Sequence, residues 1–287
     1  MRSVSSMPAV PARALSSDTC GLADLFASYG SAAEVRSVLS LGSGWSRRWT
    51  ASWRVAGAEV VCPVRDLASM PLAGSEPVRR FTWRPRQRHR PGLQFLVSTG
   101  RHHGFESLAE QRLLLALDFV GGLVDVLAQP FRLRFATTTG WREHTPDFLT
   151  ITRNGRWLFD VKPAERIGDD DRVCFAAADE ASLASGWRYG VVTGWRPHVL
   201  ATLDALSAQR RELDDRLGLQ AELISAVKAG ATKSGSCSFG ALVTATSLPV
   251  VARAHALHLL WHRRLGIDLA QPLTDQSPVW LAPPRPS

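Results

Sequence analysis

The pattern of hydrophobic and polar positions marks two β-rich stretches of the chain, and each stretch surrounds a turn signal. Residues 48–64 alternate aromatic and β-branched side chains around Gly57, and this period of two predicts a β-hairpin. Residues 145–152 and 156–162 form a second pair of β-rich runs, separated by Asn154-Gly155. Because the Asn-Gly dipeptide favours the tight turns that join paired strands, we expect a second hairpin here.

A helical period appears between these hairpins. Phe105, Leu108 and Phe119 fall on one stripe of the segment 104–119, which predicts a helix. The other expected elements of this region are strands at 123–128, 131–135 and 187–193 and an alanine-rich helix at 171–185. Helices that alternate with strands in this way indicate a mixed α/β core.

After Pro197 the pattern becomes helical. We expect helices at 200–217, 219–229, 239–244 and 248–265, followed by a short wing-like hairpin within 267–279. Helix, turn, helix and wing are typical of a small winged-helix domain. The chain therefore divides into a flexible tail (1–20), a β-rich N-terminal module with a basic arm (21–100), the α/β core (101–196) and the helical domain (197–287).

Composition adds a charge bias and excludes several classes of protein. The 287 residues carry a formal net charge of +8, with 31 arginines and only three lysines. Arginine suits bidentate contacts to phosphate, although the codon bias of a GC-rich genome explains the ratio equally well. The four cysteines are scattered, as in a cytoplasmic protein with reduced thiols. No apolar run reaches the roughly 18 residues of a membrane span.

The positive charge is concentrated in the segment 78–103, which contains no acidic residue. Its arginines are Arg79, Arg80, Arg84, Arg86, Arg88, Arg90 and Arg101. Phe81 and Trp83 lie among them, and aromatic rings among cations suit binding to a nucleic-acid backbone and its bases. A solvated strand edge that is kept soluble by charge is the alternative.

The second hairpin carries the candidate chemistry. Asp147 lies on its first strand, and Asp160 and Lys162 lie on its second. Residues two apart on a strand point to the same face, and the hairpin brings Asp147 beside Asp160. Two carboxylates at one place form a hard-oxygen site for Mg²⁺ or Mn²⁺, which polarises a phosphodiester and activates water. The adjacent Lys162 orients that water or stabilises the charge of the transition state.

These residues resemble the signature of the PD-(D/E)xK nuclease superfamily, in which Pro-Asp is followed after a spacer by Asp-x-Lys. The surrounding stretch is similar to TnsA, the endonuclease subunit of heteromeric transposases. The similar segments are FESLAEQ (105–111), AQPF (128–131), HTPDF (144–148) and DVKPAERI (160–167). The family takes its first acid from an S-x-x-E helix, which implies Glu110 as the third metal ligand rather than Glu106. Gln129 is a further candidate near the site.

The resemblance implies a restriction-endonuclease-like core and a metal-dependent DNA endonuclease. Such a subunit cleaves the 5′ strands at transposon ends, while a TnsB-like DDE transposase cleaves and joins the 3′ strands. The C-terminal domain of the family contacts an AAA+ regulator that resembles TnsC. Two alternatives stay open: a stand-alone repair or restriction-type nuclease, and a non-catalytic winged-helix DNA-binding assembly protein.

Overall fold

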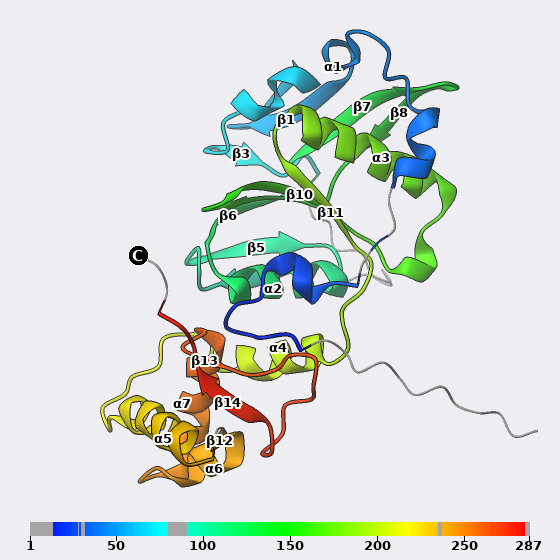
Figure 1. Ribbon diagram of the computed structural model, residues 1–287. Helices are drawn as coiled ribbons and strands as arrows, with labels where there is room; N and C mark the ends of the chain where they lie inside the picture. The colour runs from blue at the N-terminus through cyan, green and yellow to red at the C-terminus, as the bar shows by residue number, and fades with distance from the viewer. Residues whose placement is uncertain (1–13, 28, 30–31, 80–90, 235–236, 285–287) are drawn as a thin grey trace, which may run out of the picture. The chain divides into compact units, whose positions relative to one another are not determined.

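The computed structural model describes residues 14–27, 29, 32–79, 91–234 and 237–284 (Figure 1). The protein is a mixed α/β chain with several antiparallel sheets. It divides into two compact units, Leu25–Trp195 and the combination of Met1–Asp24 with Arg196–Ser287. Each unit has its own hydrophobic core, so each is described by itself below.

A five-stranded sheet forms one part of the larger unit. Its strands are β1 (Thr50–Val55), β2 (Ala58–Pro63), β3 (Ser75–Glu76), β7 (Phe131–Thr137) and β8 (Gly140–His144). The order is β2-β1-β7-β8, and β3 also pairs with β1. The hairpin expected around Gly57 is confirmed as β1–β2, whose two turn residues Ala56 and Gly57 both have positive φ, as the tightest hairpin turns require. Strand β1 also pairs with β7, so the expected N-terminal module and the expected core share one sheet.

A four-stranded sheet forms the other part of this unit. Its strands are β6 (Leu123–Ala128), β9 (Phe148–Thr152), β10 (Gly155–Val161) and β11 (Arg188–Val192). The order is β11-β10-β9-β6, with β10 and β11 parallel and the other pairs antiparallel. The second expected hairpin is confirmed as β9–β10, although Arg153 and Asn154 form its loop and Gly155 already begins β10.

Two helices flank the four-stranded sheet (Figure 1). Helix α3 (Asp169–Ala184) makes the parallel crossover from β10 to β11 and packs between this sheet and β8. Its alanines, such as Ala177 and Ala181, are fully buried, because small side chains let the helix approach the sheets closely. Helix α2 (Leu108–Val120) packs on the other side, against β6, β10 and the hairpin of β4 (Gly92–Leu96) and β5 (Arg101–Phe105).

The larger unit also contains several short helical turns. They are the helical turns η1 (Leu22–Leu25, which starts in the other unit), η2 (Ala32–Val38), α1 (Trp45–Arg48), η3 (Val64–Ser69) and η4 (Ala164–Arg166). Trp53 and Leu133 from the five-stranded sheet and Leu149 and Leu158 from the four-stranded sheet are buried in one core cluster. Both sheets are therefore fixed to one core, and the ends of β8, β9 and β10 converge.

The smaller unit contains helices α4 (Val199–Ser207), α5 (Leu219–Ser234), α6 (Phe239–Thr244) and α7 (Pro249–Trp261). The strands β12 (Cys237–Ser238), β13 (Leu265–Gly266) and β14 (Pro278–Leu281) form a small sheet with the order β12-β14-β13. Leu15 and Ser17, in the expected tail, are buried here, and the backbone N–H of Ser17 donates to the carbonyl of Ile267.

One helical prediction in this unit is wrong in its second half. The helix expected at 200–217 ends at Ser207 as α4. Asp215, near the end of the expected helix, serves the next helix instead: its carboxylate accepts hydrogen bonds from the backbone N–H groups of Leu219 and Gln220 at 2.8 and 3.0 Å. These N–H groups start α5 and have no partner inside that helix, so Asp215 supplies one.

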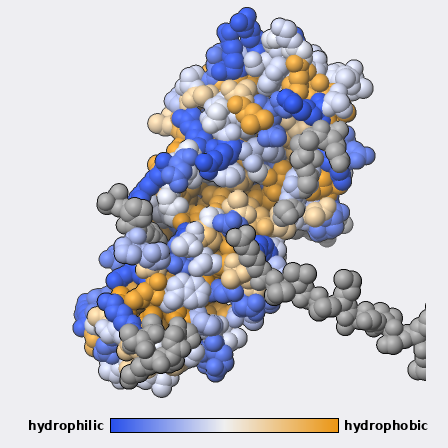
Figure 2. Space-filling view, viewed as in Figure 1, coloured by the Kyte–Doolittle hydropathy of each residue, from blue (hydrophilic) through white to orange (hydrophobic). Residues whose placement is uncertain are grey.

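No helix in the described part of the chain is long and apolar enough to cross a membrane. Figure 2 shows hydrophilic and hydrophobic residues interspersed on the face in view of each unit.

Candidate active site

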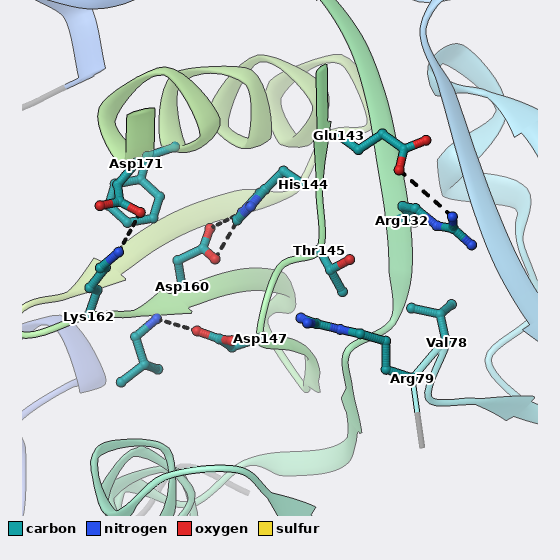
Figure 3. Close-up of a pocket in the computed structure, with 12 residues that line it drawn as sticks. Val78, Arg79, Arg132, Glu143, His144, Thr145, Asp147, Asp160, Lys162 and Asp171 are labelled. Atoms are coloured by element: carbon teal, nitrogen blue, oxygen red, sulfur yellow. Dashed lines mark hydrogen bonds and ion pairs between the residues drawn. The ribbon is translucent and has the colours of Figure 1, made fainter. Parts of the chain in front are cut away.

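A cavity of about 610 Å³ is lined by residues of β7, β8, β10 and α3 and by the segment that joins β8 to β9. Four residues that the sequence analysis selected line it: Arg79, Asp147, Asp160 and Lys162. Figure 3 shows both carboxylates and the lysine in this cavity. Of the residues predicted for catalysis, the structure thus brings together the three from the β9–β10 hairpin.

The hairpin register explains why Asp147 and Asp160 lie together. Phe148 pairs with Phe159, and the backbone N–H of Asp147 donates to the carbonyl of Phe159 at 2.9 Å. The Asp147 side chain then turns along β10, where its Oδ2 accepts a hydrogen bond from the N–H of Val161 at 2.7 Å. Asp160 stands between these two backbone contacts, so the two carboxylates are neighbours.

Asp160 is buried, and two side chains that the sequence analysis did not select hold it. Nε2 of His144 lies 3.0 Å from both carboxylate oxygens (Figure 3). The hydroxyl of Tyr189 donates to Oδ2 at 2.6 Å. Burial lowers the pKa of His144. The charge of Asp160 and the hydrogen bond to it have the larger, opposite effect, and together they raise this pKa to about 10. At neutral pH His144 is therefore an imidazolium, paired with the carboxylate.

Asp147 lies close to two other acidic side chains, and the pKa of its carboxyl group responds to them. Burial raises its pKa well above the ordinary value, and the charges of Asp160 and Glu110 raise it further. A bound cation relieves such repulsion, because an opposite charge favours the ionised carboxylates.

The donor set fits a hard divalent metal ion. Mg²⁺ commonly binds through one or two carboxylates and completes its shell with water and substrate phosphate, and Asp147 and Asp160 supply two. The described residues contain no group of three His, Cys, Asp or Glu side chains placed to hold a metal. The remaining ligands of an ion here would be water and the substrate.

Glu110, the predicted third ligand, does not line the cavity. Its carboxylate accepts hydrogen bonds from Oγ of Ser107 and from the backbone N–H of Glu106, both at 2.8 Å. Ser107 in turn accepts from the Glu110 N–H as the N-cap of α2. The S-x-x-E pattern thus forms a capping arrangement at the start of the helix, in which Glu106 takes part only through its backbone N–H. Burial is the main cause that raises the pKa of Glu110.

Gln129 supports the backbone of the site. It joins β6 to β7 with φ at +45°, and its backbone N–H donates to the carbonyl of Asp147 at 2.7 Å. Its carbonyl accepts from the N–H of Val78 at 3.0 Å. The side chain is buried and does not line the cavity, and its Oε1 has no hydrogen-bond partner among the described residues. Gln129 therefore fixes the position of Asp147 through the main chain.

Lys162 has a dedicated acidic partner. Its Nζ lies 2.5 Å from Oδ1 of Asp171, a residue of α3 that also lines the cavity. Although burial alone raises the pKa of Asp171, the hydrogen bond from Lys162 and its charge lower this pKa below the ordinary value. Three successive aspartates at a helix start are expected from the helix dipole alone, so the sequence carries no signal that singles out Asp171.

The predicted basic arm is described only at its ends. Arg79 lines the main cavity, whereas Arg101 forms an ion pair with Asp125 beside a second cavity. The arginines Arg80, Arg84, Arg86, Arg88 and Arg90 lie outside the described residues. Arg132, from β7, adds a cation to the main cavity, where it faces Glu143 at 3.7 Å.

His144 was missed because its strand has no apolar alternation. Strand β8 reads Gly-Trp-Arg-Glu-His and contains no buried residue. The signal that was present is the position of His144 three residues before Asp147, in the segment HTPDF.

Comparison with known proteins adds no assignment: no protein-family model matches the chain, and no curated protein matches it at a significant level.

Proposed function

We propose that the protein is a metal-dependent DNA endonuclease of the PD-(D/E)xK type, and that it acts as a TnsA-like subunit at transposon ends. The observation that carries this proposal is the cavity in which Asp147, Asp160 and Lys162 meet. Two adjacent carboxylates with a lysine two residues after the second match the donor set that metal-assisted phosphodiester hydrolysis needs. The four-stranded sheet between two helices is compatible with a restriction-endonuclease-like core.

In this proposal Asp147 and Asp160 hold Mg²⁺ or Mn²⁺. When bound, such an ion supplies Lewis acidity to the phosphate and lowers the pKa of water. His144 and Tyr189 keep the Asp160 carboxylate in one orientation. Lys162 places a positive charge where negative charge develops on the phosphate oxygens. The oxygen of water bonds to phosphorus, the bond to the 3′ oxygen breaks, and the products carry a 5′ phosphate and a 3′ hydroxyl.

Glu110 as third metal ligand stays a prediction. Its hydrogen bonds stabilise the start of α2, and its charge raises the pKa of Asp147.

DNA binding is proposed for the arginines near the cavity and for the smaller unit. Arg79 and Arg132 line the cavity, and the acid-free arm follows Arg79 in the sequence. In the smaller unit the order α5, β12, α6, α7, β13, β14 is the order of a winged helix.

A protein partner is proposed for the smaller unit as well. Leu248, Val250 and Val251 are exposed at the start of α7, with Val250 at 91%. Apolar side chains suit a protein surface better than a phosphate backbone, which supports contact with a TnsC-like regulator. A TnsB-like transposase and a cytoplasmic, DNA-associated location complete the proposal.

The test is a strand-cleavage assay on DNA that contains the ends of the transposon, with Mg²⁺ and with the neighbouring transposase subunit present or absent. We expect wild-type protein and the control Asp170→Asn to cleave the 5′ strands, and Asp160→Ala and Lys162→Ala to lose this activity. Asp170 is a suitable control because its side chain is 91% exposed and pairs with Arg142 outside the cavity. Equal cleavage by all four proteins contradicts the assigned site.

The same assay decides between the alternatives. Cleavage without any transposase subunit favours a stand-alone nuclease. No cleavage under any condition favours a non-catalytic assembly protein, for which the hydrogen-bonded state of Asp160 and Glu110 is the supporting observation.

A further inference from the structure

The ion pair between Lys162 and Asp171 lies inside the candidate site. Both side chains line the cavity that holds Asp147 and Asp160, and Nζ of Lys162 points to Oδ1 of Asp171 at 2.5 Å (Figure 3). Lys162 follows the end of β10, and Asp171 belongs to the first turn of α3. The pair thus joins the strand that carries the motif to the helix that follows it.

Asp171 is itself fixed. Its second oxygen, Oδ2, accepts a hydrogen bond from the backbone N–H of Gly168 at 2.8 Å. Each carboxylate oxygen therefore has its own partner, and the group cannot rotate without losing one of them. The ammonium group of Lys162 ends a flexible four-carbon chain, and Asp171 gives it one defined location.

The neighbouring acids on the same turn behave differently. Asp169 is exposed, and the side chain of Asp170 is 91% exposed and pairs with Arg142 at 2.8 Å. Both supply negative charge to the start of α3, where it interacts favourably with the helix dipole. Asp171 is thus distinguished from them by its place in the cavity rather than by its charge.

The stability of the folded protein does not explain the ion pair between Lys162 and Asp171. The side chain of Lys162 is 34% exposed and that of Asp171 is 27% exposed. Ion pairs that remain open to water contribute little to folding, because solvent screens them and both side chains lose conformational entropy. A contact of this kind inside a reactive cavity is better explained by what it does to the lysine.

We propose that Asp171 is a positioning residue, which holds the Lys162 ammonium group where charge develops on the scissile phosphate. This inference rests on the proposed nuclease function. It predicts that loss of the Asp171 charge reduces the rate of the chemical step and leaves the binding of DNA and metal unchanged.

The decisive variant is Asp171→Asn. The amide oxygen retains the hydrogen bond from the Gly168 N–H, so the amide NH₂ turns toward Lys162. Two donors then face each other, and the contact is lost while the helix start is preserved. The matched control is Asp170→Asn, which removes one charge from the same turn outside the cavity.

We expect Asp171→Asn to lower the single-turnover cleavage rate about 10²-fold, since misplacement of a reacting group by about 1 Å costs this much. The dissociation constants for DNA and for Mn²⁺ and the rate of Asp170→Asn should stay at the wild-type values. Lost Mn²⁺ binding in Asp171→Asn overturns the proposal.

A second readout does not depend on cleavage. The chain has three lysines, so mass spectrometry resolves the acetylation of each after brief exposure of metal-free protein to acetic anhydride. Relative to Lys228, Lys162 should react faster in Asp171→Asn than in wild type or in Asp170→Asn. If the wild type cleaves DNA and Asp171→Asn cleaves it at the same rate, the positioning role alone is overturned. No cleavage by wild type overturns the proposed function, and the acetylation rates then show separately whether Asp171 holds Lys162.

Discussion

The start of α2 and the β9–β10 hairpin both place acidic residues near the site, but in different chemical states. At α2 the Glu110 carboxylate accepts hydrogen bonds from Ser107 and from the Glu106 backbone. In the hairpin, Asp147 and Asp160 line a cavity, and among the described residues the Asp147 carboxylate accepts one hydrogen bond, from Val161. The Glu110 carboxylate is thus held by the helix start, whereas the Asp147 carboxylate keeps most of its lone pairs for a ligand.

The difference follows from local geometry. The first N–H groups of a helix lack partners within the helix, so the carboxylate of an acid at the third position accepts hydrogen bonds at the helix start. Strand backbone groups pair with the neighbouring strand instead, which leaves most of the lone pairs of the Asp147 carboxylate for other partners. A carboxylate at the end of a strand is therefore a better candidate for metal binding than one at a helix start.

The largest effect is expected at the hairpin. Asp147→Asn or Asp160→Asn should reduce cleavage at least about 10²-fold, because loss of one metal ligand removes several kcal/mol of transition-state stabilisation. Single-turnover cleavage at saturating Mg²⁺ measures this change. If both variants retain more than about a tenth of the wild-type rate, the hairpin carboxylates are not the metal ligands, and the contrast with the start of α2 fails.

The next effect concerns His144 and has a defined pH dependence. Its pKa is about 10 in the folded protein against 6.5 for an ordinary histidine. A raised pKa stabilises the folded state fully below about pH 6.5, and this contribution is lost as the pH rises to about 10. His144→Ala should lower the free energy of unfolding by about 3 kcal/mol at neutral pH, because it leaves Asp160 buried without its cation.

Urea unfolding of metal-free protein between pH 6 and 10 measures this contribution. Wild type should become less stable toward pH 10, and the difference from His144→Ala should shrink over the same interval. A difference that is independent of pH contradicts the ion pair between His144 and Asp160.

Glu110→Gln separates the two regions directly. If Glu110 serves the helix start, the variant should lower the free energy of unfolding by about 1 kcal/mol and cleavage by no more than about tenfold. Thermal unfolding and cleavage of the same preparation give both numbers. A loss of cleavage equal to that of Asp160→Asn, with stability unchanged, makes Glu110 a metal ligand.

The smallest effect is expected for Ser107→Ala. Loss of an N-cap costs about 1 kcal/mol or less in stability, and the Glu110 carboxylate also loses one of its two donors. We expect thermal unfolding to shift to a slightly lower temperature and the affinity for Mn²⁺ to stay unchanged. A clear change in Mn²⁺ affinity indicates that the cap and the metal site are coupled.

The parts that the sequence predicted are those with local signals. The first hairpin followed from the alternation around Gly57 and the second from the Asn154-Gly155 dipeptide, and the β9–β10 register then placed Asp147 beside Asp160. Helix α6 was expected at about 239–244 and has these limits, and its N-cap Ser238, whose side chain accepts from the N–H of Ala241, lies next to it in the sequence. Local patterns were sufficient wherever the turn or the cap lies next to the element.

The parts that were missed depend on distant contacts. Strand β8 has no apolar face of its own and exists because it pairs with β7. His144 and Tyr189 reach Asp160 from strands 16 and 29 residues away in the chain. No spacing rule links such positions, so these partners became visible only in the folded structure.

The central claim is that Asp147 and Asp160 together bind a divalent metal ion in the cavity. A titration with Mn²⁺, followed by electron paramagnetic resonance of the free ion, tests it without DNA or a partner subunit. The account predicts saturable binding by wild type and by Asp170→Asn, and its loss in both Asp147→Asn and Asp160→Asn. Equal binding of Mn²⁺ by all four proteins, or by none of them, contradicts it.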